Sequence, residues 1–120
     1  MNILGVDFGK KRIGLAWVDT AIGAPLPYGI VQNSTELADL IQKERIQKVV
    51  IGLPVGLDGK ENENTKIVRR FAEELRQAIT APIELIDERF TSAQADRMGG
   101  DASRDEKEAM LILQTYIDRP

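Results

Sequence analysis

The sequence contains no cysteine and no histidine among its 120 residues. Without these residues the chain cannot form disulfides, use a thiolate nucleophile or build a Cys/His zinc site. A Ser-His-Asp catalytic triad is excluded as well, because its base is missing. Any catalysis must therefore rely on carboxylates, hydroxyl groups, lysine or arginine, or a bound hard metal ion.

Aromatic residues and long hydrophobic runs are scarce. Phe, Trp and Tyr make up 5% of the chain, and no run approaches the roughly 18 apolar residues of a membrane span. A strand-like pattern starts at once, without a signal segment, so we expect a cytoplasmic protein that does not contact membranes. Its length predicts a single domain over residues 1–120. The net charge of -3 disfavours strong nonspecific binding to nucleic acid, although local basic patches can still form.

The hydrophobic pattern predicts an α/β fold. Apolar, β-branched runs predict five strands, at residues 3–8, 13–18, 28–31, 48–53 and 83–86. Amphipathic stripes predict three helices, which start near residue 34, cover about 64–80 and cover about 105–117. Strands that alternate with helices pair with each other in parallel, and each helix forms a right-handed crossover between them. The first three strands, which no helix separates, would form an antiparallel meander. We therefore expect a five-stranded mixed sheet with helices on both faces.

An aspartate stands inside the first predicted strand, in the segment GVDFGKKRIG. Alternation along the strand places Asp7 on the same face as Ile3 and Gly5. A charged carboxylate in a packed sheet is costly unless it is paired or binds a metal ion. Taken alone, Asp7 is explained equally well as a functional carboxylate or as an aspartate that hydrogen-bonds the turn after the strand.

Two further carboxylate positions fall where a site could form. Glu88, preceded by Asp87, ends the last predicted strand, where open α/β sheets place ligands, although taken alone this segment is better explained as a helix cap. Asp105 starts the last helix in line with its apolar face, although an acid there also suits the helix dipole. Together with Asp7 they would form an all-oxygen cluster suited to Mg²⁺ or Mn²⁺, which supports phosphodiester hydrolysis without a histidine base.

Cations lie close to the proposed acids in the sequence. Arg12 and Arg89 are candidates for binding the phosphates of a substrate, because a guanidinium group binds phosphate in a bidentate manner. The alternative is that each is a solvated charge or part of a surface ion pair. That alternative is favoured for Lys10 and Lys11.

Four motifs run in order along nearly the whole chain: DFGKKRIG (7–14), GLPVGLDG (52–59), DERFTS (87–92) and D-x-x-x-A-M-L-I-L-x-x-Y (105–116). At these spacings the set resembles the YqgF family, also called RuvX. The resemblance implies an RNase H-like fold and a metal-dependent nuclease. The expected substrate is the 5′ end of precursor 16S rRNA, with ribosomal particles as partners, or alternatively a branched DNA such as a Holliday junction.

The resemblance also implies roles for individual residues. The catalytic and metal-binding acids would be Asp7, Glu88 and Asp105, with Mg²⁺ or Mn²⁺ as the cofactor. Nucleic-acid contacts would come from Arg12, Arg89, Lys11 and Thr91. Structural turns would be formed by Gly9, Gly14, Gly52, Pro54, Asp58 and Gly59.

Two features depart from the family pattern. Glu108 replaces the first small residue of the family's D-x-x-A-A motif, so it either adds a carboxylate to the site or turns to solvent. Segment 93–104 is short and lacks the basic character of its family counterpart, which bears on how firmly substrate is held.

Other functions fit parts of the sequence. A D-x-G segment also resembles the phosphate loop of actin-like ATPases, but the second such loop is not found in these 120 residues. A non-catalytic assembly factor that binds RNA or ribosomal particles is consistent with the sequence pI of about 5.0. The sequence leaves open RNA or DNA as substrate, and a monomer or a homodimer. A homodimer would suit junction resolution, and short apolar stretches around Trp17 and Leu26, which we expect to be exposed, could form its contact.

Overall fold

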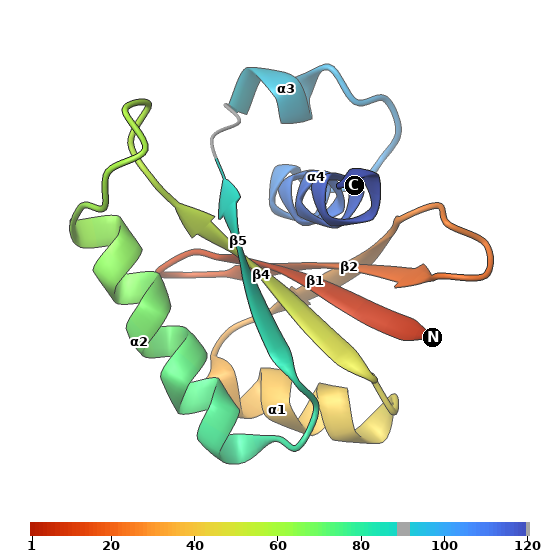
Figure 1. Cartoon of the computed structure of the whole chain (residues 1–120). Coiled ribbons are helices and arrows are strands. Elements are labelled where there is room, and N and C mark those ends of the chain that lie inside the picture. Colours follow the sequence, from red (N-terminus) through yellow and green to blue (C-terminus); the bar gives the residue numbers. More distant parts are fainter. Residues whose placement is uncertain (89–91, 120) are drawn as a thin grey trace.

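The computed structural model describes residues 1–88 and 92–119, and it contains a five-stranded sheet with helices on both faces (Figure 1). The strands are β1 (Asn2–Phe8), β2 (Ile13–Asp19), β3 (Leu26–Val31), β4 (Lys48–Pro54) and β5 (Ile83–Glu88). The helices are α1 (Ser34–Lys43), α2 (Glu63–Ala78), α3 (Ser92–Asp96) and α4 (Arg104–Asp118). The five predicted strands and the three longer helices are confirmed, whereas the short helix α3 was not predicted.

The strands are ordered β3-β2-β1-β4-β5 across the sheet. β1, β2 and β3 pair antiparallel, whereas β4 pairs in parallel with both β1 and β5. The sheet is therefore mixed, as predicted. Because β1, β4 and β5 run in the same direction, their carboxyl ends meet at one edge, where open α/β sheets form ligand sites.

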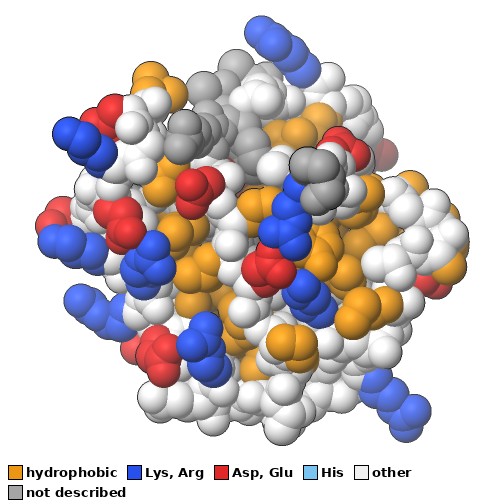
Figure 2. Space-filling model, viewed as in Figure 1, with side chains coloured by type: hydrophobic (Ala, Val, Ile, Leu, Met, Phe, Trp, Pro, Cys, Tyr) orange, Lys and Arg blue, Asp and Glu red, His pale blue; other side chains and the backbone are white. Residues whose placement is uncertain are grey.

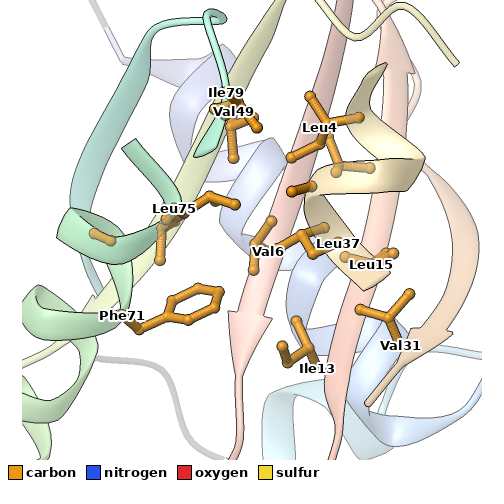
Figure 3. Close-up of a cluster of buried hydrophobic side chains, with 14 of the residues drawn as sticks. Leu4, Val6, Ile13, Leu15, Val31, Leu37, Val49, Phe71, Leu75 and Ile79 are labelled. Carbon is orange, nitrogen blue, oxygen red and sulfur yellow. The ribbon is translucent and has the colours of Figure 1, made fainter. Parts of the chain in front are cut away.

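Helices α1 and α2 cover one face of the sheet and enclose the larger hydrophobic core (Figures 1 and 3). Leu4 and Val6 of β1 point into this core, where they meet Leu37 of α1. Phe71 and Leu75 of α2 close it from the other side. Alternate residues of β1 thus face α1 and α2, which leaves the residues between them for the opposite face.

Helix α4 packs on the opposite face (Figure 1). Ile3 of β1 contacts Ile112 and Leu113 in a second, smaller core. A Cβ atom built on Gly5 would lie 2.5 Å from Cγ of Leu113, so the helix packs directly against the backbone of β1. Asp7 shares a face of the strand with Ile3 and Gly5, as predicted, and it therefore faces α4.

The first turn of α4 is fixed to the sheet through a capping box. The hydroxyl of Ser103 accepts a hydrogen bond from the amide of Glu106, whose carboxylate accepts one from the amide of Ser103. The second carboxylate oxygen of Glu106 accepts a hydrogen bond from the amide of Gly29 in β3, at 2.9 Å. One side chain thus caps the helix and ties its start to an edge strand.

The last turn of α4 is fastened at the other end of the sheet. Nζ of Lys48 lies 2.8 Å from both the hydroxyl of Tyr116 and a carboxylate oxygen of Glu84. The Tyr116 ring lies between two cations, with Lys48 4.8 Å and Arg119 4.4 Å from its centroid. Arg119 also pairs with Glu84, so strands β4 and β5 hold the end of the helix.

Three residues that were expected at turns lie within strands instead. Gly14 belongs to β2, while Gly52 and Pro54 belong to β4. A glycine is needed at position 14 because a Cβ there would lie 2.2 Å from the carbonyl oxygen of Asp105. Position 14 is thus a site of close backbone packing, which the sequence motif does not distinguish from a turn.

The remaining turn positions are confirmed. Gly9 lies in the β1–β2 turn, where a Cβ would come within 2.6 Å of the carbonyl oxygen of Arg12, so the tight hairpin itself requires glycine. Asp58 and Gly59 form the turn after β4. The Asp58 carboxylate accepts a hydrogen bond from the amide of Lys60 at 2.9 Å, and Gly59 has a φ of 79°.

The surface carries charges of both signs. Acidic and basic side chains intermingle on the part of the surface formed by α2, with apolar side chains visible between them (Figure 2). The predicted exposure of Leu26 is confirmed, whereas Trp17 is half-buried and packs near Tyr28, with ring centroids 6.4 Å apart. Within the described part of the chain, none of the helices has the length and apolar character needed to cross a bilayer.

Candidate nuclease site

Three carboxylates from the two ends of the chain converge beside the end of β1. Asp7, Asp105 and Glu108 each offer one oxygen atom, and these three atoms all lie within 4.8 Å of one another. Asp105 and Glu108 are three residues apart on α4, which places them on the same side of the helix. This side faces Asp7 across the junction between α4 and β1, so one small ion could contact all three acids.

Glu88 is a fourth carboxylate beside this cluster, although it is outside the three-acid group found among the described residues. A Cβ atom built on Gly52 would lie 2.4 Å from Oε2 of Glu88, so the carboxylate lies over the backbone of β4. Burial raises the pKa of Glu88 to about 7, and the negative charge of Glu108 adds to this shift. Asp87 is exposed, and its charge acts on Arg69 of α2.

The environment of Asp7 strongly disfavours its charged form when no cation is bound. The pKa of Asp7 is raised to about 9, first by burial and next by a side-chain hydrogen bond with Glu108. The negative charges of Glu88 and Asp105 raise it further. Several acids held this close cannot all ionise unless positive charge is supplied, and they share protons as a coupled group.

Arg12 supplies one positive charge at the rim of the cluster. Its Nε lies 3.2 Å from Oδ2 of Asp105, and its side chain is 64% exposed. The ion-pair alternative is therefore realised, and the contact between Arg12 and nucleic acid stays a prediction. Because the guanidinium group remains largely accessible, the ion pair leaves nitrogen atoms free to contact a ligand.

The structure brings together some of the predicted site residues and not others. Asp7, Asp105 and Arg12 meet at one place with Glu88 beside them, while Lys11 is exposed in the β1–β2 turn. The predicted nucleic-acid contacts at positions 89 and 91, Arg89 and Thr91, lie outside the described residues.

Glu108 was not among the three predicted catalytic acids, because the sequence left open whether it adds a carboxylate to the site or turns to solvent. It follows Asp105 by three residues and borders the apolar stripe of the same helix. The alternative in which Glu108 turns to solvent is wrong, because its carboxylate lies in the three-acid group.

The donor set fits a hard divalent cation. All four carboxylates offer oxygen atoms, the ligands that such cations prefer over the nitrogen and sulfur ligands of zinc. A cation would also offset the repulsion that raises the pKa values of Asp7 and Glu88. The cluster therefore has both the ligands and the electrostatic need for a divalent metal ion.

Comparisons with known proteins show what this chain resembles in sequence and in fold. A sequence model of the RuvX family, described as Holliday junction resolvase, matches residues 1–119. A relative from Maridesulfovibrio salexigens, named as a pre-16S rRNA nuclease, is 35% identical over 99% of both chains. A relative of the same name from Sulfurihydrogenibium sp. is 38% identical over 98% of this chain and 90% of its own.

The fold resembles that of RuvC from Thermus thermophilus in complex with a Holliday junction substrate. The TM-score is 0.64 at 13% sequence identity, and the match covers 98% of this chain and 93% of that one. The expected RNase H-like architecture is therefore confirmed. Because the family model matches nearly every residue and the two relatives align almost end to end, this chain belongs to the RuvX family.

Proposed function

We propose that the chain is a metal-dependent nuclease that hydrolyses phosphodiester bonds, with the 5′ end of precursor 16S rRNA as its substrate. The observation that carries this proposal is the convergence of Asp7, Asp105 and Glu108 within 4.8 Å at the open end of the sheet. Membership of the RuvX family and the names of the relatives support a phosphodiester-cleaving hydrolase and this RNA.

Mg²⁺ or Mn²⁺ would be held by Asp7, Asp105 and Glu108, with Glu88 beside them. When bound, such a cation polarises the phosphate and lowers the pKa of an attacking water molecule. The protein supplies a fixed, half-buried set of carboxylates on two rigid elements, β1 and α4. Catalysis then requires no histidine, in agreement with the composition.

The protein's own groups would position the substrate and accept its proton. Glu88, which lies beside the three-acid group, would take a proton from the attacking water. Arg12 would hold a phosphate oxygen while its Nε keeps Asp105 oriented. Lys11, Arg89 and Thr91 are proposed as further contacts to the nucleic acid. Such a protein would act in the cytoplasm, as a single domain, on ribosomal particles that carry the precursor RNA.

The direct test is cleavage of an RNA that spans the precursor 5′ end, in the presence of Mg²⁺ or Mn²⁺. The Asp7→Asn variant should lose this cleavage while keeping its circular dichroism spectrum and cooperative unfolding. Asp39→Asn is the matched control, because Asp39 is an exposed carboxylate on α1. Equal cleavage by wild type and Asp7→Asn would mean that the activity comes from a contaminant. RNA binding without cleavage would indicate the non-catalytic assembly factor.

Branched DNA is the second candidate substrate, favoured by the family description and by the RuvC–junction complex. A junction resolvase cuts two strands symmetrically, which suits a homodimer. Cleavage of a synthetic four-way junction, measured beside the RNA under the same conditions, separates the two substrates. Sedimentation of the free protein and of the junction complex would show whether a dimer forms.

A further inference from the structure

A groove lies beside the end of β1, on the side of the sheet opposite to the acids. It consists of two cavities of about 270 Å³ and 240 Å³, which share Phe8, Gly9, Lys10 and Ile67 in their walls. Because they share these walls, the cavities form one continuous depression between the β1–β2 turn and helix α2. We call this depression the hairpin groove.

The hairpin groove and the acid cluster are separated by the thickness of a single strand. Asp7 and Phe8 are consecutive residues of β1, so their side chains leave the strand on opposite faces. Asp7 faces α4 and the other acids, whereas Phe8 lines the groove and packs on the core beneath α2. Pro54, at the end of β4, lines the same groove. A chain that crosses the end of β1 at Gly9 would therefore contact both sites.

The floor of the groove is apolar and includes aromatic rings. The rings of Phe8 and Phe71 are 4.5 Å apart at an angle of 35°, and Ile67 lies beside them. Because Phe71 is a buried core residue, this contact holds the ring of Phe8 in a defined position. Nucleobases stack on such aromatic side chains with little dependence on sequence.

The walls of the groove carry more positive than negative charge. Lys10 and Arg70 line it, together with the single acid Glu74. Neither cation forms an ion pair with any residue that the structure describes, so both are available for a ligand. This local excess of cations contrasts with the net charge of -3 of the whole chain, and it suits a phosphate backbone.

We propose that the hairpin groove binds an unpaired nucleotide of the substrate, next to the phosphate held at the acid cluster. The base would lie against Phe8 and Ile67, while Lys10 and Arg70 contact the neighbouring phosphates. Each cavity is smaller than the roughly 300 Å³ at which pockets for drug-sized ligands begin, so each suits one base or sugar. The proposal rests on the proposed nuclease function, because that function supplies the nucleic acid.

The first test measures binding rather than cleavage. A labelled single-stranded RNA is titrated into the Asp7→Asn protein, and the dissociation constant is followed by fluorescence anisotropy at several salt concentrations. Lys10→Ala combined with Arg70→Ala should weaken binding about tenfold, and the salt slope should fall by about 1.4, which corresponds to two lost phosphate contacts. Lys43→Ala combined with Arg76→Ala is the matched control, because these exposed cations lie in the last turns of α1 and α2.

The second test removes the aromatic ring while keeping an apolar side chain. Phe8→Leu should weaken RNA binding at least fivefold at constant salt slope, because stacking is lost and no charge changes. Thermal unfolding verifies that the variant is folded. Unchanged affinity in both the double variant and Phe8→Leu would overturn the groove proposal. Cleavage by the wild-type protein tests the nuclease function separately. Weaker RNA binding by the groove variants without wild-type cleavage would support the groove and contradict the nuclease. Cleavage with unchanged binding would support the nuclease and contradict the groove.

Discussion

Gly52 makes room for Glu88: a Cβ atom at position 52 would lie 2.4 Å from Oε2 of that carboxylate. It would also lie 2.5 Å from Cδ1 of Ile112, which anchors α4 on the sheet. We expect Gly52→Ala to displace Glu88 and to strain the contact with α4. Cleavage should fall by about a hundredfold, the loss expected when a catalytic group moves by about 1 Å. The free energy of unfolding should fall by about 1–3 kcal/mol because the added methyl group overpacks the contact with α4.

Gly99→Ala is the matched control for this substitution, because among the described residues, apart from its two chain neighbours, no atom lies within 4 Å of the added methyl group. Urea unfolding and steady-state cleavage of both variants provide the measurement. If Gly52→Ala behaves like Gly99→Ala in both assays, the added methyl group is accommodated without displacing Glu88 or α4, which contradicts this prediction.

The second prediction concerns Glu108, the acid that departs from the family pattern. Glu108→Ala should weaken the binding of Mn²⁺ by about tenfold or more, because one of three converging oxygen ligands is lost. Cleavage at limiting Mn²⁺ should fall, and part of the loss should be restored at high Mn²⁺. Isothermal titration calorimetry measures the affinity, with Asp39→Asn as the control. An unchanged affinity for Mn²⁺ would show that Glu108 does not bind the metal ion.

The third prediction concerns stability without metal. The pKa of Asp7 is about 9 in the folded protein, compared with an ordinary value of 3.8, so the folded state binds a proton that the unfolded state has released. Stability due to this group is therefore present below the ordinary pKa and is lost as the pH rises towards 9. In EDTA, Asp7→Asn should be more stable than wild type at about pH 8, and the difference should shrink towards about pH 5.

Thermal unfolding at both pH values measures this difference. Added Mn²⁺ should reverse the order at about pH 8, because it binds more tightly to the protein that retains the Asp7 carboxylate and so stabilises it more. A gain of the same size at both pH values would show that the substitution acts through packing rather than through charge.

The fourth prediction concerns the far end of α4. Tyr116→Phe removes the hydroxyl that accepts a hydrogen bond from Lys48 but keeps the ring between the two cations. The free energy of unfolding should fall by about 1 kcal/mol, with cleavage unchanged when the protein is folded. Lys48→Met should cost more, because it also removes the ion pair with Glu84. An equal loss in both variants would contradict a contribution from that ion pair.

The sequence predicts the side of the sheet on which Asp7 lies, because strand alternation is a local property. It also predicts Asp105, whose alignment with the apolar stripe of α4 is visible in the spacing. The approach of Glu108 to Asp7 depends on how α4 is rotated on the sheet. Contacts such as that of Gly5 with Leu113 set this rotation. These residues lie about a hundred positions apart, so no local sequence pattern predicts the rotation.

Positions where another segment packs closely against the backbone of a strand cannot be predicted from the sequence, for the same reason. Gly14 and Gly52 look like turn residues in their motifs, yet they lie in strands and accommodate Asp105 and Glu88. Helix α3 escaped prediction because its five residues are too few to display a helical period.

The fastening of α4 at both ends has a consequence for the order of events during synthesis. Asp7 is synthesised roughly a hundred residues before Asp105 and Glu108. Until α4 docks, one face of β1 and β4 stays uncovered and the acids remain apart. A nascent chain that lacks α4 therefore cannot assemble this cluster, and the three acids meet only after this helix has docked on the sheet.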